Sequence, residues 1–154
     1  MNSPATIQLA STADAPAIAR LSRDLIEQGL GWRWTAARVR RSLFDAATNV
    51  AVVRGDDGGV AGFGLMRYDD DEAHLLLLAV ASAQQGRGLG MALVTWLELP
   101  ARVAGLKRVW LEARDGNLGA VRFYRRLGYR EFARVPGYYE GREGCVRMGR
   151  DLEP

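Results

Sequence analysis

Six consecutive residues near the middle of the chain, Gln85-Gly86-Arg87-Gly88-Leu89-Gly90, have the composition of a loop that binds phosphate. Three glycines at alternate positions let the backbone turn sharply and approach a ligand without a Cβ in the way. The exposed amides and the positive end of the helix expected to follow favour an anion such as a pyrophosphate. An ordinary glycine-rich turn is the alternative, and Arg87 favours phosphate over it.

Neither of two common nucleotide-binding motifs fits this loop. A P-loop needs Lys and then Ser or Thr after its last glycine, whereas Met91 follows Gly90, so a nucleoside triphosphatase is excluded. A dinucleotide fingerprint needs a third glycine where Met91 stands, although Glu112 ends the next strand, where a ribose-binding carboxylate would lie. The strands before the loop form an antiparallel meander and the chain after it is too short for a doubly wound sheet. Dinucleotide binding is therefore the weaker alternative.

The elements before the loop follow from alternation and turn signals. A short strand is expected at residues 5–10, followed by a helix that Thr12 or Asp14 caps and that ends at the glycines near residue 30. Thr35 starts a second helix, whose apolar residues, Phe44 among them, are expected to face inward. Three strands are then expected, at residues 49–54, 60–68 and 72–80, and the apolar run in the last is typical of a strand covered on both faces.

After the loop the pattern changes to helix, strand, helix and strand. Pro100 interrupts the first of these helices, so a kink or a new helical start is expected there, with Gly105 as the stop. A strand at residues 108–113, a helix at 117–127 and strands near 129–135 and 145–152 complete the chain. The sequence therefore predicts an α/β (α+β mixed) fold with a central sheet, in a single domain that spans residues 1–154.

Composition narrows the class of protein. The chain has 154 residues, of which 48% are hydrophobic and 25% charged, values that exclude a disordered or collagen-like protein. It has no apolar run of the roughly 18–20 residues that a membrane span needs, and no secretory signal is visible, so no membrane partner is expected. Cys145 is the one cysteine, which favours a reducing, cytoplasmic location. The formal net charge of +3 suits an anionic ligand.

Two motifs in the right order make the chain resemble the GNAT superfamily of N-acetyltransferases. Gln85-x-x-Gly88-x-Gly90 is similar to that family's acyl-CoA pyrophosphate loop, and the second block is Asn117-x-x-Ala120-x-x-Phe123-Tyr124-x-x-Leu127-Gly128-Tyr129. The resemblance covers nearly the whole chain. It implies the GNAT fold, a central mixed, mostly antiparallel sheet of about six or seven strands flanked by about four helices. It also implies acetyl-CoA as co-substrate.

Within the family, the chain most resembles the ribosomal-protein-alanine N-acetyltransferase branch. The segments that carry this likeness are Trp110-Leu111-Glu112-Ala113-Arg114 and Tyr138-Tyr139-Glu140-Gly141-Arg142-Glu143. The chain departs from the common pattern at Ser82, where the family often has proline, and at Gly144-Cys145, where the branch usually has Asp-Ala. The lead-in through Trp32 and Trp34 also differs from that branch. These departures concern the peptide substrate and leave the acetyl-CoA site untouched.

Acetyl transfer to an amine needs a base and a proton donor for the departing thiolate. Glu112, at the end of a central strand, is the candidate base, directly or through water, and burial against Trp110 would raise its pKa. The alternative is a structural ion pair with Arg114 or Arg108. Tyr124 is the candidate acid, since a phenol is neutral at working pH, and a core aromatic is its alternative reading.

The resemblance implies the remaining site residues. Cofactor binding is assigned to the strand residues Leu78, Ala79 and Val80, to the loop residues Gln85, Gly86, Arg87, Gly88, Leu89 and Gly90, and to Asn117, which also caps a helix. One of Arg122, Arg125 and Arg126 is expected to meet the cofactor's phosphates. Trp32 and Trp34 in one loop and Tyr138 and Tyr139 in another are the candidate substrate-binding residues, loop anchoring being the alternative.

The sequence thus predicts an acetyl-CoA-dependent N-acetyltransferase that acts by direct attack in a ternary complex, with a protein N-terminal amine as acceptor. A small-molecule amine such as a polyamine, amino acid or aminoglycoside is the first alternative, and a non-catalytic acyl-CoA-binding module the second. No metal is expected, because His74 lacks neighbouring ligands in suitable spacing. No nucleic-acid partner is expected, since aromatics do not interleave with the Arg clusters. A homodimer is left open.

Overall fold

The computed structural model describes residues 6–152, and in that part of the chain one sheet runs in the order β1-β2-β3-β4-β5-β7-β6. Its strands are β1 (Ile7–Leu9), β2 (Thr48–Arg54), β3 (Val60–Tyr68), β4 (Glu72–Val80), β5 (Arg108–Arg114), β6 (Arg130–Tyr139) and β7 (Glu143–Asp151). Neighbouring strands are antiparallel except for the parallel pair β4 and β5. The predicted mixed, mostly antiparallel sheet is confirmed.

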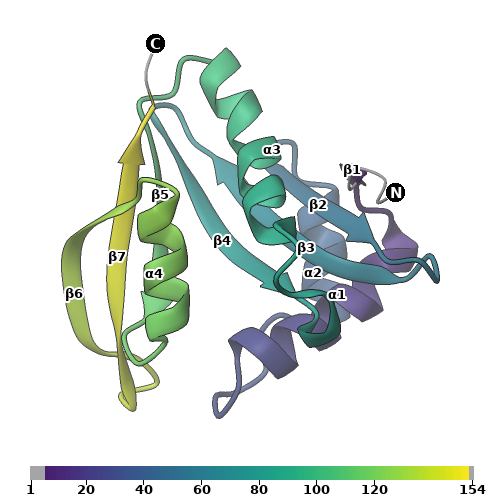
Figure 1. The fold of residues 1–154 in the computed structure, drawn as a ribbon, viewed down its shortest axis with the longest axis horizontal. Coiled ribbons are helices and arrows are strands. Elements are labelled where there is room, and N and C mark those ends of the chain that lie inside the picture. The colour runs from purple at the N-terminus through teal and green to yellow at the C-terminus, as the bar shows by residue number, and fades with distance from the viewer. Residues whose placement is uncertain (1–5, 153–154) are drawn as a thin grey trace.

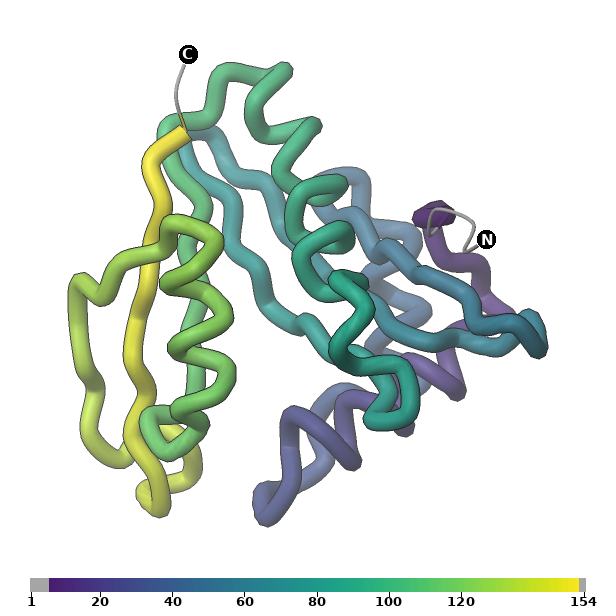
Figure 2. Tube along the Cα trace, in the orientation of Figure 1, coloured from purple at the N-terminus to yellow at the C-terminus, as the bar shows by residue number. Residues whose placement is uncertain are grey.

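Helices cover both faces of the sheet (Figure 1). The helices are α1 (Ala15–Leu21), α2 (Ala36–Leu43), α3 (Leu89–Val103) and α4 (Leu118–Arg126). Figure 2 shows α1 and α2 behind the sheet and α3 and α4 in front of it. Ile18 and Val39 pack with Phe63 on the first face, and Leu93 and Leu97 from α3 pack on the second. The sheet is therefore the middle of three layers.

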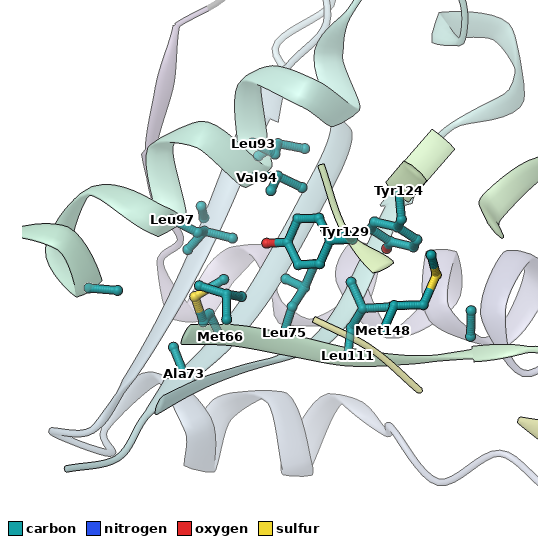
Figure 3. Packing of buried hydrophobic residues seen from close by; sticks show 14 of the residues in the cluster. Met66, Ala73, Leu75, Leu93, Val94, Leu97, Leu111, Tyr124, Tyr129 and Met148 are labelled. Atoms are coloured by element: carbon teal, nitrogen blue, oxygen red, sulfur yellow. The ribbon is translucent and has the colours of Figure 1, made fainter. Parts of the chain in front are cut away.

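The core in front of the sheet is built around one aromatic ring (Figure 3). The ring of Tyr129 lies among Leu93, Leu97 and Leu75, and its hydroxyl donates to Oε2 of the buried Glu98 at 2.7 Å. Because that hydroxyl has a partner, the fold buries the phenol without an unsatisfied polar group. Tyr124 packs edge-on against the Tyr129 ring, with 5.8 Å between the ring centroids. Packing against Tyr129 therefore positions α4 and its residue Tyr124, the candidate acid.

Asp14, one of the two predicted caps, occupies the N-cap position of α1, but the helical segment begins before it and α1 ends earlier than predicted. Ser11, one residue before Thr12, starts the helical segment, and its amide donates to Oδ2 of Asp14 at 2.9 Å. α1 ends at Leu21, and the next turn is a π-helix (Ser22–Ile26) that closes with a bond from the Glu27 amide to the Ser22 carbonyl at 2.8 Å. π-turns of this kind are frequent at functional sites.

Pro100 does not restart α3, which runs unbroken from Leu89 to Val103. Proline removes the amide that would bind the Trp96 carbonyl, but Pro100 lies on the exposed side of the helix, where water can satisfy that carbonyl. The helix then stops as expected, at Gly105 with φ of +76°.

β4 is the strand on which both cores meet, and its register changes halfway. Leu75 pairs with Met66 and Leu77 with Leu65, so Leu76 is an extra residue that forms a β-bulge. On its other side β4 pairs with β5 only from Glu72 to Leu75. Beyond that point the two strands separate, as Figure 1 shows, and no strand within residues 6–152 pairs with this side of residues 76–80. The sheet therefore opens at its centre.

Phe44 is the one clear error in the predicted core, since its side chain is 79% exposed. α2 begins as expected, with Thr35 accepting the Arg38 amide at 3.3 Å. The helix ends at Leu43, so Phe44 is the residue after the last helical turn and its side chain leaves the apolar stripe that Val39 continues.

Val39→Ala and Phe44→Ala form a matched pair that tests this placement. Val39 is fully buried, so its truncation removes two methyl groups from the core and should lower the free energy of unfolding by about 2 kcal/mol. Phe44→Ala should change it by less than about 0.5 kcal/mol, as at most surface positions. Urea unfolding followed by circular dichroism measures both, and equal losses would contradict the outward position of Phe44.

Candidate active site

Two cavities lie where β4 and β5 separate. The glycine-loop cavity, of about 660 Å³, is lined by Gly86, Gly88 and Gly90, and the Glu112 cavity, of about 430 Å³, lies beside Glu112. Both volumes are in the range of small-molecule sites. The residues that line both are Leu25, Leu78, Asn117, Ala120 and Tyr124. A ligand that enters over the glycine loop therefore reaches the Glu112 cavity beside Tyr124.

The glycine loop has the backbone that an anion site requires. Gly86 and Gly88 have φ of +82° and +76°, a conformation that other residues rarely adopt. No atom lies within 4 Å of the place where a Cβ would stand on either glycine, so the loop surface is open. Gly88 precedes the first residue of α3, and the unpaired amides of that helix end favour an anion. Gly90 serves packing as well, since a Cβ there would meet the Phe123 ring at 3.1 Å.

The polar side chains of this loop have different positions. Gln85 lines the cavity and donates its side-chain amide to the Val80 carbonyl at 3.0 Å, which fixes the corner between β4 and the loop. Arg87 is exposed, donates to Oε1 of Gln84 at 3.1 Å and is not among the lining residues. Of Arg122, Arg125 and Arg126, only Arg126 is among the residues that line this cavity.

The open edge of β4 forms one wall of the glycine-loop cavity. Leu78, Ala79 and Val80 line it, together with Leu89 from the first turn of α3. A strand edge without a partner offers amides and carbonyls to an extended ligand, as in strand addition. Asn117 caps α4 by accepting the Ala120 amide at 3.1 Å, and it lies at the junction of the two cavities.

Glu112 is held by groups from the strands on either side of β5. Arg147 is its register partner on β7 and donates Nε to Oε2 at 3.1 Å. His74 on β4 places Nε2 at 3.4 Å from Oε1. The alternative reading, an ion pair with Arg114 or Arg108, is not found, because Arg114 pairs with Glu143 at 2.7 Å and the Arg108 guanidinium lies over the Phe132 ring.

The charge state of Glu112 also differs from the expectation of a raised pKa. Burial does raise the pKa of this carboxyl, but hydrogen bonds from His74, Tyr138 and Arg147 outweigh burial. Its pKa therefore lies below the ordinary value, and the carboxylate is ionised at neutral pH. An ionised carboxylate in a cavity wall attracts a cationic ligand such as an ammonium group.

Tyr124 lies in the shared wall of the two cavities, and 9% of its surface is exposed. Burial raises the pKa of its phenol well above the ordinary value, so the hydroxyl stays protonated at working pH. The expectation that Phe123 is the core residue of this pair holds only in part. Phe123 is half-buried under Gly90, and the Tyr124 ring is the more buried of the two.

Three of the four aromatic candidates reach the Glu112 cavity. Trp34, Tyr138 and Tyr139 line it, and the Arg38 guanidinium covers the Trp34 ring at 3.9 Å from its centroid. Trp32 is not among the lining residues and is 43% exposed beside Arg23. The structure therefore does not bring Trp32 to the site.

Hydrogen bonds join the two loops over the Glu112 cavity. Oε2 of Glu140 accepts the Gly31 amide at 2.8 Å, and Arg142 donates to the Gly29 carbonyl at 3.1 Å. Glu27 fixes the first loop from inside, since its carboxylate accepts the Arg33 amide at 2.7 Å. The bonds of Glu140 and Arg142 connect segments far apart in the sequence and hold the cavity walls in place.

Sequence reasoning missed His74 as a neighbour of Glu112. The parallel pairing of β4 and β5 puts His74 opposite Trp110, and the two rings stack with 3.7 Å between centroids. Glu112, two residues after Trp110, lies on the same face of the sheet. In each strand, alternation shows which residues share a face, but the sequence does not show which residue of β4 lies opposite which residue of β5.

Among residues 6–152 no group of three or more His, Cys, Asp or Glu side chains is arranged to hold a metal ion. No helix in that range has the length and hydropathy of a membrane span.

Gly88→Ala tests the glycine loop, with Gly58→Ala as its matched control. Both glycines have φ near +80° and open space at the Cβ position, so both substitutions impose the same backbone strain of about 1–2 kcal/mol. Only Gly88 faces a cavity, so Gly88→Ala should weaken binding of coenzyme A by about tenfold or more. Calorimetric titration measures this, and equal affinities of the two variants would contradict the assignment.

Comparison with known proteins places this site in a family. Residues 18–129 match the sequence model of the acetyltransferase (GNAT) family. The chain is 28% identical over 146 residues to [ribosomal protein bS18]-alanine N-acetyltransferase of Escherichia coli K12, which covers 93% of this chain and 95% of that protein. The crystal structure of the ribosomal-protein-S18-alanine N-acetyltransferase from Escherichia coli matches with a TM-score of 0.81 and 27% identity, over 98% of this chain and 96% of that one.

Two further relatives match over shorter stretches. An N-acetyltransferase of Methanocaldococcus jannaschii is 39% identical over 93 residues, 60% of each protein. Streptothricin acetyltransferase of Streptomyces lavendulae is 31% identical over 99 residues, which is 63% of this chain and 52% of that protein. The family match covers the glycine loop, β5 and α4 together, so this chain belongs to the GNAT family of acetyltransferases.

Proposed function

We propose that this N-acetyltransferase acetylates the N-terminal amine of a protein. The observation that carries the proposal is the meeting of the two cavities at Tyr124, with the glycine loop on one side and Glu112 on the other. The relative that matches over nearly the whole chain acts on the alanine of a ribosomal protein, which favours a peptide acceptor. The walls of Trp34, Tyr138 and Tyr139 suit a short extended segment.

The residues of the glycine-loop cavity fit acetyl-CoA. Amides of Gly86, Gly88 and the first turn of α3 would hold the pyrophosphate, with Arg126 as a nearby cation. The unpaired edge of residues 78–80 would pair with the pantetheine amides, and a backbone amide there would polarise the thioester carbonyl. When bound, acetyl-CoA supplies the acetyl group as an activated thioester.

Glu112 is assigned the role of base. Its ionised carboxylate would attract the acceptor's ammonium and take a proton from it, directly or through water. The ammonium loses two protons in the whole reaction, because the amide product keeps one hydrogen on nitrogen. One of those two protons ends on the coenzyme's sulfur and the other leaves to solvent. The neutral amine then attacks the thioester in a ternary complex, without a covalent enzyme intermediate.

Tyr124 is assigned the role of acid. Tyr124 lines both cavities, and the thioester sulfur must stand at their junction if the acetyl group is to face Glu112. The Tyr124 hydroxyl stays protonated at working pH. The phenol would donate its hydrogen to the departing thiolate and regain one from the attacking nitrogen. Because the hydroxyl does not change charge at neutral pH, its contribution should be constant over the working range.

A small-molecule amine is the second candidate acceptor. The observation that favours it is the match to streptothricin acetyltransferase, although this chain spans about half of that protein's length. A small amine would need only the Glu112 cavity, whereas a peptide would also contact the loops joined by Glu140. A non-catalytic acyl-CoA-binding module is the third reading, and any acetyl transfer dependent on Glu112 excludes it.

Mass spectrometry of two peptides tests the acceptor. One peptide begins with a free alanine amine, and the other is blocked at its N-terminus but carries an internal lysine. With acetyl-CoA present, a mass gain of one acetyl group on the first peptide alone is expected. Acetylation of the lysine peptide, or of neither peptide while acetyl-CoA still binds, would overturn the N-terminal assignment and direct the search to small amines.

Tyr124→Phe should lower kcat by about 10²-fold, the lower end of what positioned proton transfer contributes, and leave the affinity for acetyl-CoA unchanged. Tyr68→Phe is the control, since it removes a phenol that donates to the Leu97 carbonyl at 2.6 Å, outside both cavities. That control should lose stability and keep kcat. Steady-state release of coenzyme A measures both variants, and a Tyr124→Phe enzyme as active as the parent would remove Tyr124 from the mechanism.

A further inference from the structure

His74 is a buried polar side chain with a single polar neighbour. The residue is 6% exposed and lies in the wall of the Glu112 cavity. Its Nε2 is 3.4 Å from Oε1 of Glu112, while its Nδ1 is buried without a hydrogen-bond partner among residues 6–152. The Trp110 ring stacks on the imidazole with 12° between the ring planes, which fixes the orientation of both nitrogens.

The hydrogen-bond count indicates which nitrogen carries the hydrogen. A carboxylate only accepts, so the nitrogen that faces Glu112 must donate. The hydrogen that His74 presents to Glu112 is therefore on Nε2, while Nδ1 has no partner among residues 6–152. A buried polar atom without a partner costs free energy that an apolar side chain would not cost. A leucine of similar volume would leave no such unpaired atom, and the polar contact that this histidine does make is the one from Nε2 to Glu112.

We propose that His74 is a positioning residue for Glu112: its Nε2–H holds Oε1 of the carboxylate against the wall that β4 and β5 share, so that the carboxylate faces the acceptor amine. The inference rests on the proposed role of Glu112 as base. Arg147 holds the other oxygen from β7, so the carboxylate is fixed at both oxygens. A carboxylate fixed in this way loses little orientation when the acceptor binds.

The groups around this pair come from several strands. Tyr138 and Tyr139 approach Glu112 from β6, and Arg147 and Cys145 approach it from β7. On β3 the register partner of His74 is Arg67, whose guanidinium lies 3.7 Å from Asp69. Arg147 is thus the arginine that pairs with the carboxylate. Since the hydrogen bond from His74 lowers the pKa of Glu112, its loss should raise that pKa.

Three substitutions separate positioning from packing. His74→Gln keeps an N–H donor at about the reach of Nε2, His74→Leu keeps the volume without a donor, and His74→Asn is polar but too short to reach Oε1. The titration of the Glu112 carboxyl is followed by NMR in protein labelled with ¹³C at glutamate carboxyls, with Glu112→Gln to assign the signal. kcat, KM and thermal unfolding are measured on the same samples.

The expected result is a split between the variants. His74→Leu and His74→Asn should titrate Glu112 at higher pH than the parent and lose about tenfold or more in kcat, as misplaced catalytic groups do. His74→Gln should keep both values near those of the parent. An unchanged Glu112 titration in His74→Leu and His74→Asn, or a His74→Gln variant as impaired as His74→Leu, would overturn the proposal. Full activity of Glu112→Gln would instead overturn the proposed base and leave the titration result standing.

Discussion

The separation of β4 from β5 is the structural constraint on which the site depends. The two strands pair only from Glu72 and Arg108 to Leu75 and Leu111. The glycine-loop cavity lies beyond that point, and the Glu112 cavity extends from His74 and Leu75 into the opening. An opening in the middle of a sheet leaves backbone groups without partners, which is unfavourable unless a ligand or water satisfies them. The bulge at Leu76 lies where pairing ends, and bulges are common beside active sites. The backbone groups that are unpaired in the sheet thus form an edge that a ligand can bind.

The two cores keep this opening rigid from both sides. α3 and α4 pack on one face around Tyr129, and α1 and α2 cover the other face over Phe63 and Leu65. The core around Tyr129 joins the two halves of the sheet, since Leu75 belongs to one half and Leu111 and Met148 to the other. Tyr124 on α4 and Glu112 on β5 belong to the same half, while the glycine loop extends from the other. Binding of acetyl-CoA would therefore bridge the halves.

Most helices and strands could be predicted from the sequence because turn residues and the alternation of apolar residues depend only on neighbouring positions in the chain. The strands at residues 60–68 and 72–80 were placed to the residue by turn signals and alternation, and the glycine loop by its spacing. The predicted burial of Phe44 was wrong because α2 ends at Leu43, one residue before the end of the apolar pattern. The partners of Glu112 could not be predicted, for a different reason. Its partners His74 and Arg147 come from other strands, and the register that brings them together is a tertiary property.

A crystal structure of the protein with coenzyme A joined covalently to an N-terminal alanine peptide tests the central claim most directly. The pyrophosphate is expected on the amides of the glycine loop, and the pantetheine is expected to pair with residues 78–80. The sulfur is expected within hydrogen-bonding reach of the Tyr124 hydroxyl, and the alanine nitrogen on the side of Glu112. A sulfur remote from Tyr124, or a peptide that leaves the site without entering the Glu112 cavity, would contradict this claim.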